Sequence, residues 1–193
     1  MGSQRLTFRS YEPADDDAIW ELHRWAMRET GVDPDDVPGT DDLRSVRSSY
    51  IDSGGAFVVG VVDSLSGDGS DAAATPEDVD ASAREALRTR DGVVVAMGGY
   101  LPNSAGHADE RDRPGAADLH RMRVAPPCQR QGFGRTLIAE LERRAAAAEF
   151  ESLLATTSTR QSSALSFYPD NGYEEVGRST AGAYELVHYE KSL

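Results

Sequence analysis

Residues 118–134 read DLHRMRVAPPCQRQGFG, and RTLIAELERRAAAA follows without a break. The run 119–124 is typical of a short strand, which Pro126 and Pro127 end. After Gly132 and Gly134 the apolar spacing is that of a helix. The stretch therefore predicts a strand, a tight turn and a helix N-terminus. Such a turn suits an anion, most often a phosphate, because the first N–H groups of a helix have no internal partners and lie at the positive end of its dipole.

Two nucleotide-binding motifs do not fit this turn. A P-loop needs Gly-Lys-Ser/Thr, but Gly134 is followed by Arg-Thr, and the dinucleotide motif G-x-G-x-x-G is present only in its first half. The turn instead resembles the Q/R-x-x-G-x-G/A signature of GNAT-superfamily N-acetyltransferases, through Gln129, Gly132 and Gly134. The resemblance implies a loop that binds the pyrophosphate of acetyl-CoA. The glycines would let the main chain approach the ligand where a Cβ would collide.

A second match to the same family lies near the C-terminus, where residues 161–173 read QSSALSFYPDNGY. This segment resembles the family pattern N-x-x-A-x-x-L/F-Y-x-x-x-G-F, with matches at Ala164, Phe167, Tyr168 and Gly172. Gln161 stands where the family usually has Asn, which is a departure at a position that contacts the cofactor. Two patterns in the right order are far more specific than either alone.

The resemblance implies a cofactor site that acetyl-CoA occupies as co-substrate. Its residues are Met122, Arg123, Val124, Gln129, Arg130, Gln131, Gly132, Phe133, Gly134, Arg135, Thr136 and Gln161. The main chain of residues 122–124 would pair with the pantetheine arm. Six arginines against two glutamates lie between Arg121 and Arg144, in a chain of net charge −13, and such a basic island concentrates a polyanion. For Arg143 and Arg144 the alternative is a solvated helix face.

Acylation of an amine by a thioester needs a neutral amine, a polarised carbonyl and a proton for the departing thiolate. Tyr168 matches the general acid of the family, and its alternative role is a core tyrosine beside Phe167. Asp118 stands where many members carry a glutamate base, and it would act through a water. His120 is the competing base, because the ordinary pKa of histidine is near neutral.

A β-bulge is predicted within the strand of this stretch. In a regular strand Leu119 and Met122 would face opposite sides, yet both are apolar and favour burial. The family has such a bulge, and its freed N–H groups would stabilise the oxyanion of the thioester. The helix that follows is predicted to bury Phe133, Leu137, Leu141 and Ala145.

The remaining titratable side chains predict no further chemistry. Cys128 is the single cysteine, which excludes an internal disulfide, and without a partnering base it is expected to be inert. His23, His107 and His188 have no metal-ligand spacing, so no metal is expected.

The whole chain, residues 1–193, predicts one α/β domain with a GNAT-like mixed central sheet of about six to seven strands and about four helices. The expected strands are 5–9, 55–63, 92–101, 119–124, 151–157, 173–177 and 183–190. A helix begins near Pro13 with Ile19, Leu22, Trp25 and Ala26 on its apolar face, and Gly31 ends it. Thr40 is expected to cap a second helix, with Leu43, Val46, Tyr50 and Ile51 on one face. Residues 64–90 are an expected surface insertion with a helix from Thr75 to Arg88, and 162–168 form a short helix.

Composition limits the partners. Aspartate and glutamate number 33 against 20 lysines and arginines, and this carboxylate-rich surface resembles that of halophilic proteins. It argues against nucleic acid as a partner. No apolar run approaches the roughly 20 residues that cross a bilayer and no leader is evident, so a cytoplasmic protein without a membrane partner is expected.

These observations together predict an N-acetyltransferase that transfers acetyl from acetyl-CoA directly to an amine of a small molecule or protein, with a homodimer as an open option. The acids Asp33, Asp35, Asp36, Asp41 and Asp42 would attract a cationic amine or belong to the carboxylate surface. The alternative function is a non-catalytic acyl-CoA-binding or sensing module. A third, nucleotide phosphotransfer, lacks the lysine it requires.

Overall fold

The computed structural model describes residues 5–28, 39–65, 81–105 and 112–193. The strands are β1 (Thr7–Ser10), β2 (Ala56–Val62), β3 (Arg88–Thr89), β4 (Gly92–Pro102), β5 (Ala116–Val124), β6 (Ser152–Ser158), β7 (Glu174–Ala181) and β8 (Tyr184–Ser192). The α-helices are α1 (Asp16–Arg28), α2 (Ala81–Ala86), α3 (Phe133–Ala147) and α4 (Ser162–Asp170). Short helical segments are η1 (Pro13–Asp15), η3 (Thr40–Arg44), η4 (Arg47–Ile51), η6 (Asn103–Ala105) and η7 (Pro126–Cys128).

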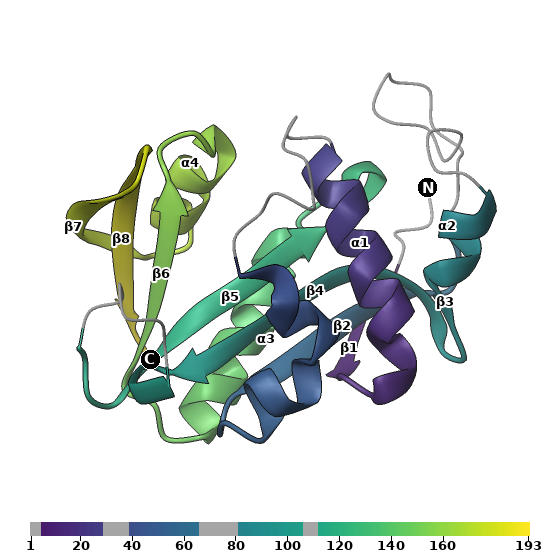
Figure 1. Ribbon diagram of the computed structural model, residues 1–193, viewed down its shortest axis with the longest axis horizontal. Coiled ribbons are helices and arrows are strands. Elements are labelled where there is room, and N and C mark those ends of the chain that lie inside the picture. Colours follow the sequence, from purple (N-terminus) through teal and green to yellow (C-terminus); the bar gives the residue numbers. More distant parts are fainter. Residues whose placement is uncertain (1–4, 29–38, 66–80, 106–111) are drawn as a thin grey trace.

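The strands form one mixed sheet in the order β1-β2-β4-β5-β6-β8-β7, and β3 pairs with β4 outside this path (Figure 1). Only the β5–β6 pair is parallel among the described strands, because α3 carries the chain back across the sheet between them. The predicted α/β fold with a mixed sheet and about four helices is confirmed. The prediction of six to seven strands missed β3, which has two residues and leaves no periodic signal.

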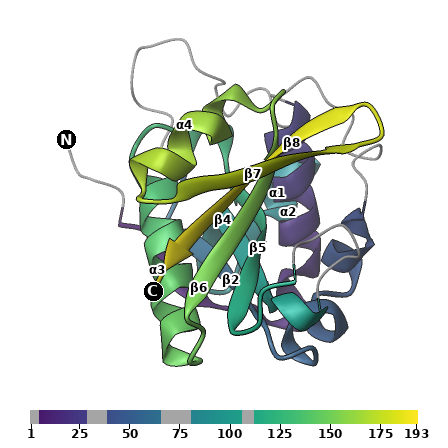
Figure 2. The ribbon, with the colours of Figure 1, turned by 90° about the vertical axis from the view of Figure 1, so that its left-hand side faces the viewer.

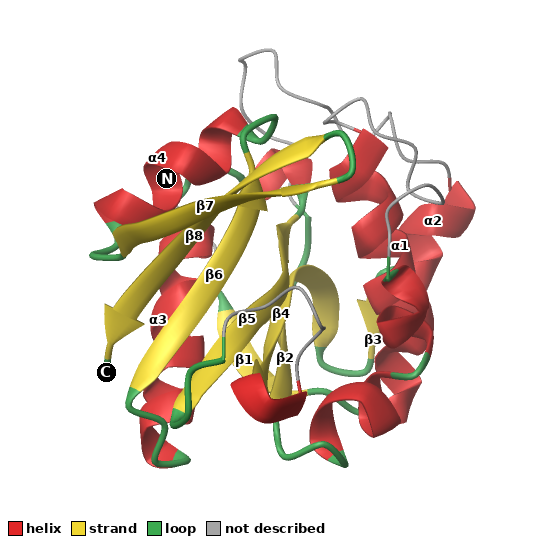
Figure 3. Cartoon of the chain, turned by 60° about the vertical axis from the view of Figure 1, so that its left-hand side comes forward, coloured by secondary structure: helices red, strands yellow, loops and turns green. Residues whose placement is uncertain are grey.

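Helices cover both faces of the sheet: α1 and α2 lie on one side, and α3 and α4 on the other (Figures 2 and 3). The predicted apolar faces are confirmed for the two long helices, since Ile19, Leu22, Trp25 and Ala26 of α1 and Phe133, Leu137, Leu141 and Ala145 of α3 are all buried. Residue Gly31, predicted to end the first helix, lies outside the described residues. The two buried clusters meet at the strands, which explains the uninterrupted apolar runs of β2 and β4.

The predicted second helix is broken into η3 and η4, a 3₁₀ and a π turn. Thr40 does not cap it: Gly39, with a φ of 75°, is the N-cap and Thr40 is the first helical residue. Leu43, Val46 and Tyr50 are buried as predicted, but Ile51 is 40% exposed. Tyr50 packs its ring 4.9 Å from that of Phe57, and the next residue on a helix points about 100° away, so Ile51 turns to solvent.

Residues 66–80 of the expected insertion, with the predicted cap Thr75, lie outside the described residues. The end of the segment is held against the core by Ala83 and Leu87, which are buried in the same cluster as α1, while most of its other described residues are exposed. Arg88 and Thr89 then pair with Val93 and Gly92, so this part of the chain extends the sheet.

Candidate active site

Strands β5 and β6 pair only at their beginnings. The pairs are Ala116↔Ser152, Ala117↔Leu153 and Asp118↔Leu154, after which the strands separate (Figure 1). Residues 120–124 of β5 and 155–158 of β6 therefore have no partner in each other, and we call this region the β5–β6 split. On its other edge β5 stays paired with β4 as far as Val124. The main chain of β5 thus has one open edge in the middle of the sheet.

The β-bulge predicted for this strand is confirmed. Met97 pairs with Arg123 and Gly99 with His120, so two residues of β5, Arg121 and Met122, lie opposite the single residue between them on β4. Arg121 has a φ of 54°, the left-handed conformation that accommodates the extra residue. The bulge lets Leu119 and Met122 both pack against the core on the α3 side.

The loop between β5 and α3 presents main-chain N–H groups. Arg130 and Gly132 have φ values of 56° and 87°, and such alternation of left- and right-handed residues makes a concave arrangement of N–H groups that binds anions. Among the described residues no main-chain acceptor pairs with the N–H groups of residues 130–135. The last three of these are the first residues of α3, at the positive end of its dipole.

The polar side chains of this loop brace it from within. Gln129 Nε2 donates to the Val124 carbonyl at 3.1 Å, Gln131 Nε2 to the Pro127 carbonyl at 2.6 Å, and Thr136 Oγ1 to the Gly132 carbonyl at 3.1 Å. The side chain of Phe133 belongs to the core. These four predicted cofactor-binding residues therefore offer a ligand their main chain, while their side chains hold the loop in shape.

Only part of the predicted basic island is available to a ligand. Arg121 is paired with Asp42, and Arg143 and Arg144 are both paired with Glu140. The alternative of a solvated helix face fits Arg143, which is 64% exposed, whereas Arg144 is 21% exposed and also donates to Ser10 Oγ. Arg130 and Arg135 are exposed and make no ion pair with any described residue. The net positive charge at the loop comes from these two side chains.

Gly134, near the start of α3, lies close to Phe167 of α4. A Cβ at this position would lie 3.3 Å from Cε2 of the Phe167 ring. The glycine thus gives room to a neighbouring side chain of the protein, and the ligand is not what a Cβ would meet first. At Gly132, by contrast, an added Cβ has no atom within 4 Å, so the left-handed φ alone requires glycine there.

Tyr168 of α4 lies among aromatic rings of the α3 side of the core. Its ring stacks on Tyr189 at 5.3 Å and meets Tyr173 and Phe167 edge-on at 5.5 and 5.6 Å. Burial raises the pKa of Tyr168 to about 12, while the charge of Arg123 lowers it in part. The phenol is therefore protonated at neutral pH, as an acid that supplies a proton must be.

The two predicted bases lie at the closed end of the split. Asp118 is buried and pairs with both Leu101 of β4 and Leu154 of β6, and Asn103 Nδ2 donates to its Oδ2 at 2.8 Å. His120 follows where the strands separate, with its ring 6.1 Å from that of Tyr50. Of the two, His120 is closer to the open edge, and it is half-buried.

A cluster of polar side chains from η3, η4 and β5 was not predicted. Arg121 Nε donates to both oxygens of Asp42 at 3.1 and 2.9 Å, Arg121 Nη2 donates to the Gly39 carbonyl at 2.6 Å, and Tyr50 Oη donates to Asp42 Oδ2 at 2.6 Å. Asp42 is thus an internal partner of the protein. Asp41 is exposed, and the other three acids of that stretch lie outside the described residues.

The guanidinium of Arg123 lies beside this cluster and makes no ion pair with the acids that the structure describes. Its Nη1 donates to the Met122 carbonyl at 2.9 Å, and its Nε is buried with no acceptor among the described residues. Burial lowers the pKa of Arg123 to about 10, and the charge of Arg121 acts in the same direction. The sequence pattern places Arg123 in the basic island and, through its main chain, beside the pantetheine arm, but no local pattern indicates that its guanidinium is buried.

Gln161 and Cys128, two further residues singled out from the sequence, both lie within the described part of the chain. Gln161 is the N-cap residue of α4, and its Oε1 accepts a hydrogen bond from Thr157 Oγ1 at 3.2 Å. Cys128 is buried, which raises the pKa of its thiol to about 11. Within the described ranges no three His, Cys, Asp or Glu side chains come together as metal ligands would. His107 lies outside the described residues.

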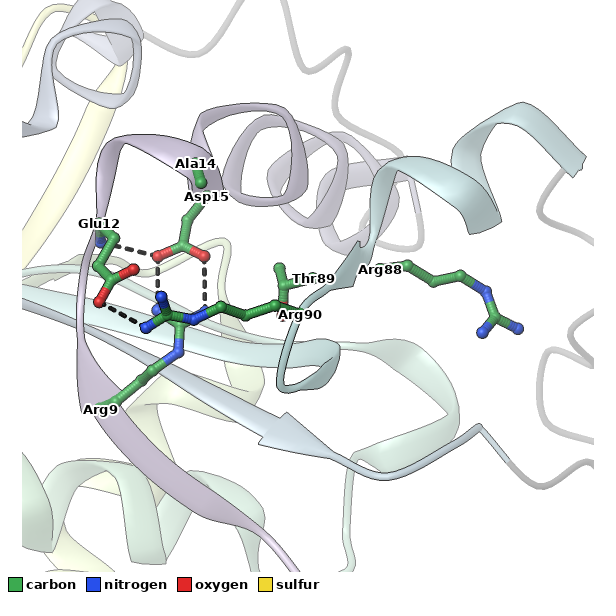
Figure 4. A pocket seen from close by; sticks show the side chains of 7 residues that line it. All are labelled: Arg9, Glu12, Ala14, Asp15, Arg88, Thr89 and Arg90. Atoms are coloured by element: carbon green, nitrogen blue, oxygen red, sulfur yellow. Dashed lines mark hydrogen bonds and ion pairs between the residues drawn. The ribbon is translucent and has the colours of Figure 1, made fainter.

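A cavity of about 290 Å³ lies away from the split, between β1, η1 and β3 (Figure 4). Ion pairs fill its lining: Arg9 pairs with Asp15 at 2.7 Å, and Arg90 with Glu12 at 2.9 Å. Two strands, β2 and β4, separate β1 from β5. The cavity therefore has no part in the site described above.

A family model and several solved structures match this chain. The model of the acetyltransferase (GNAT) family matches residues 68–173, more than half of the chain. A GNAT acetyltransferase from Staphylococcus aureus Mu50 superposes with a TM-score of 0.66 at 14% identity, over 97% of this chain and 99% of that one. A putative GNAT acetyltransferase from Desulfovibrio desulfuricans gives 0.64 at 20% over 97% and 99%. The ribosomal-protein-S18-alanine N-acetyltransferase from Escherichia coli gives 0.62 at 15% over 97% and 94%.

These structures share the fold with this chain. A search of curated protein sequences found no match. No helix within the described ranges is long and apolar enough to cross a membrane.

Proposed function

This chain belongs to the GNAT acetyltransferase family, and from that premise we propose that it transfers an acetyl group from acetyl-CoA directly to an amine in a ternary complex. The observation that carries the proposal is the set of N–H groups of residues 130–135, which find no main-chain acceptor within the described ranges, together with the open edge of β5. A diphosphate fits the N–H groups of the loop, and the extended, amide-containing pantetheine arm fits the open edge of β5. Arg130 and Arg135 add positive charge where the phosphates would lie.

The chemistry divides among the main chain and a few side chains. The amine nitrogen attacks the thioester carbonyl, the C–S bond breaks, and the sulfur leaves as a thiolate. N–H groups freed at the bulge would stabilise the oxyanion formed on the way. Tyr168 would give its proton to the thiolate, and a pKa of about 12 keeps that proton in place until the sulfur carries charge.

The amine must lose a proton before or during attack. Asp118 and His120 are the candidate bases, and the structure favours His120 for direct contact because it lies where the strands have separated. Asp118, which accepts a hydrogen bond from Asn103, would act through water or by fixing the polar environment at the closed end. A proton taken by His120 would leave on the side of β5 where Tyr50 lies, since the two rings are 6.1 Å apart.

The test combines binding with turnover. Calorimetry should detect acetyl-CoA binding to the wild-type protein, and thiol release should depend on an added amine from a panel. Both are measured at low and at molar KCl, because the carboxylate-rich surface is expected to favour high salt. Tyr168→Phe should lower kcat about 100-fold or more without changing the Kd of acetyl-CoA. Tyr184→Phe, an exposed tyrosine of β8, is the matched control.

The alternative function gives a different outcome. A non-catalytic acyl-CoA sensor would bind acetyl-CoA, release no thiol with any amine, and show no effect of Tyr168→Phe. If acetyl-CoA does not bind under any salt condition, the proposal and this alternative both fail.

A further inference from the structure

Arg123 makes no ion pair with any acidic side chain in the described part of the chain. Every hydrogen bond of its guanidinium that the described part of the chain supplies goes to one main-chain carbonyl, that of Met122 at 2.9 Å. Its Nε is buried and lacks an acceptor among those residues. Withdrawing a guanidinium from water without an anionic partner costs free energy, so proteins rarely leave one in this state unless it has a ligand.

The neighbouring arginine shows what a satisfied site looks like. Arg121 donates to both carboxylate oxygens of Asp42 and to the Gly39 carbonyl. Asp42 is in turn occupied by Arg121 and by the Tyr50 hydroxyl, and no hydrogen bond or ion pair joins it to Arg123. This group therefore has two positive charges and one negative charge, with the excess on Arg123.

The free charge lies at the place where the reaction would occur. Arg123 is in the open part of β5, past the last pair with β6. Its charge acts on the Tyr168 phenol and lowers the pKa of that group, so the two side chains are near enough to interact electrostatically. An anion bound by Arg123 would therefore be held close to the candidate acid.

The cofactor does not account for this charge. The pantetheine arm that would follow β5 is neutral, and the phosphates of the cofactor would lie at residues 130–135, where Arg130 and Arg135 are exposed and make no ion pair with a residue that the structure describes. The anion that matches Arg123 must then belong to the other substrate. A guanidinium presents parallel N–H groups that fit a carboxylate in a bidentate pair.

We propose that Arg123 binds the carboxylate of the acceptor, so that the acceptor is a small amine bearing a carboxylate, such as an amino acid. This inference rests on the proposed acetyl transfer and adds the class of substrate to it. The acceptor would enter with its carboxylate on Arg123 and its amine between His120 and the thioester carbonyl. The excess positive charge would also disfavour the protonated form of the incoming amine.

The first test compares matched acceptors. Amino acids and their C-terminal amides share a side chain but differ in the anionic group and in the pKa of the α-amine, so kcat/KM is expressed per neutral amine. On that basis the wild-type value for the acids should exceed that for the amides about 10- to 100-fold. Arg123→Gln should remove this preference, chiefly by raising KM for the acid, and leave the Kd of acetyl-CoA unchanged. Arg123→Lys should restore part of it, because the charge returns without the paired N–H groups. Arg178→Gln, on the exposed face of β7, is the control.

A second test does not need turnover. N-acetyl amino acids and N-acetyl amino amides are titrated into the complex with coenzyme A, and the carboxylates should bind at least 10-fold more tightly, a difference that Arg123→Gln should abolish. Arg123→Gln should also melt no lower than the wild type, because it removes an unneutralised charge. A purely structural arginine would instead lower the melting temperature and leave the acid-to-amide ratio unchanged.

The outcomes separate the two proposals. Equal kcat/KM for acids and amides, with acetyl transfer observed, would overturn the acceptor class and leave the acetyltransferase standing. Tight binding of the carboxylates without any turnover would support the site and refute the enzymatic function. Absence of a carboxylate preference in both tests ends the inference.

Discussion

The ion pair between Arg121 and Asp42 joins two segments that lie 79 residues apart in the sequence, and it allows a quantitative prediction. Both side chains are largely shielded, with exposed fractions of 12% and 13%. Asp42→Asn retains an acceptor for the Tyr50 hydroxyl but leaves the guanidinium without its counter-charge. Loss of one partner of a buried pair costs about 3–5 kcal/mol, and this pair is not fully buried, so we expect about 2–3 kcal/mol.

The measurement is a double-mutant cycle from urea unfolding of the wild type, Asp42→Asn, Arg121→Gln and the double variant. In thermal unfolding the single substitution of Asp42 should lower Tm by about 5–10 °C for a chain of this length. Hydrogen bonds that Arg121 makes to other groups cancel in the cycle. The coupling energy therefore reports the pair alone.

The control is Glu175 with Arg178, which also makes two hydrogen bonds, at 2.7 and 3.1 Å, but has exposed fractions of 42% and 57%. Glu175→Gln changes the net charge of −13 by the same one unit as Asp42→Asn, so relief of general repulsion is matched. We expect a much smaller coupling energy for the control and its loss in 1 M salt. Equal coupling energies for the two pairs would refute the argument that shielding from water decides their strength.

Four further outcomes can be checked directly. Gly132→Ala should lower the free energy of unfolding by about 1–2 kcal/mol, measured in urea, because only its left-handed φ of 87° is strained and no atom meets the new Cβ. Leu137→Ala, at a fully buried position of α3, should cost about 2–5 kcal/mol in the same assay. The Cys128 thiol, with a pKa of about 11, should resist alkylation at pH 8 until the protein is unfolded, and rapid reaction of the folded protein would contradict its burial. Since Tyr168 must be protonated to act and its pKa is about 12, kcat should not decline between pH 8 and 10 through loss of this proton; a Tyr168-dependent decline there would contradict the raised pKa.

Local patterns predicted the elements that carry the site. The β5–loop–α3 stretch was readable because prolines, glycines and helical spacing all act within a few residues, and the bulge followed from two apolar residues three positions apart. The broken η3–η4 segment was not readable, since its shape depends on Tyr50 packing against Phe57 and bonding to Asp42. The cluster of Arg121, Asp42 and Tyr50 was not predictable either, because its members are far apart in the sequence.

The candidate site, too, was predictable in part from local patterns. The glycines and Tyr168 were recognised from motifs, but the sequence could not tell that Gln129 and Gln131 brace the loop instead of facing a ligand. It also could not distinguish a neutralised arginine from an unneutralised one. That distinction depends on which carboxylates the fold brings into contact, and among the described residues Asp42 pairs with Arg121 but makes no hydrogen bond or ion pair with Arg123.

The open edge of β5 would let its main chain bind the acetyl donor while its side chains contact the acceptor. If the peptide-like amides of the shared donor complete the sheet there, recognition of the donor depends on backbone geometry and imposes little on the amino acids that occupy those positions. The side chains at these positions can then change to select new acceptors, while binding of the donor by the main chain is retained. Substitution of one arginine in the middle of the sheet would be enough to redirect such an enzyme.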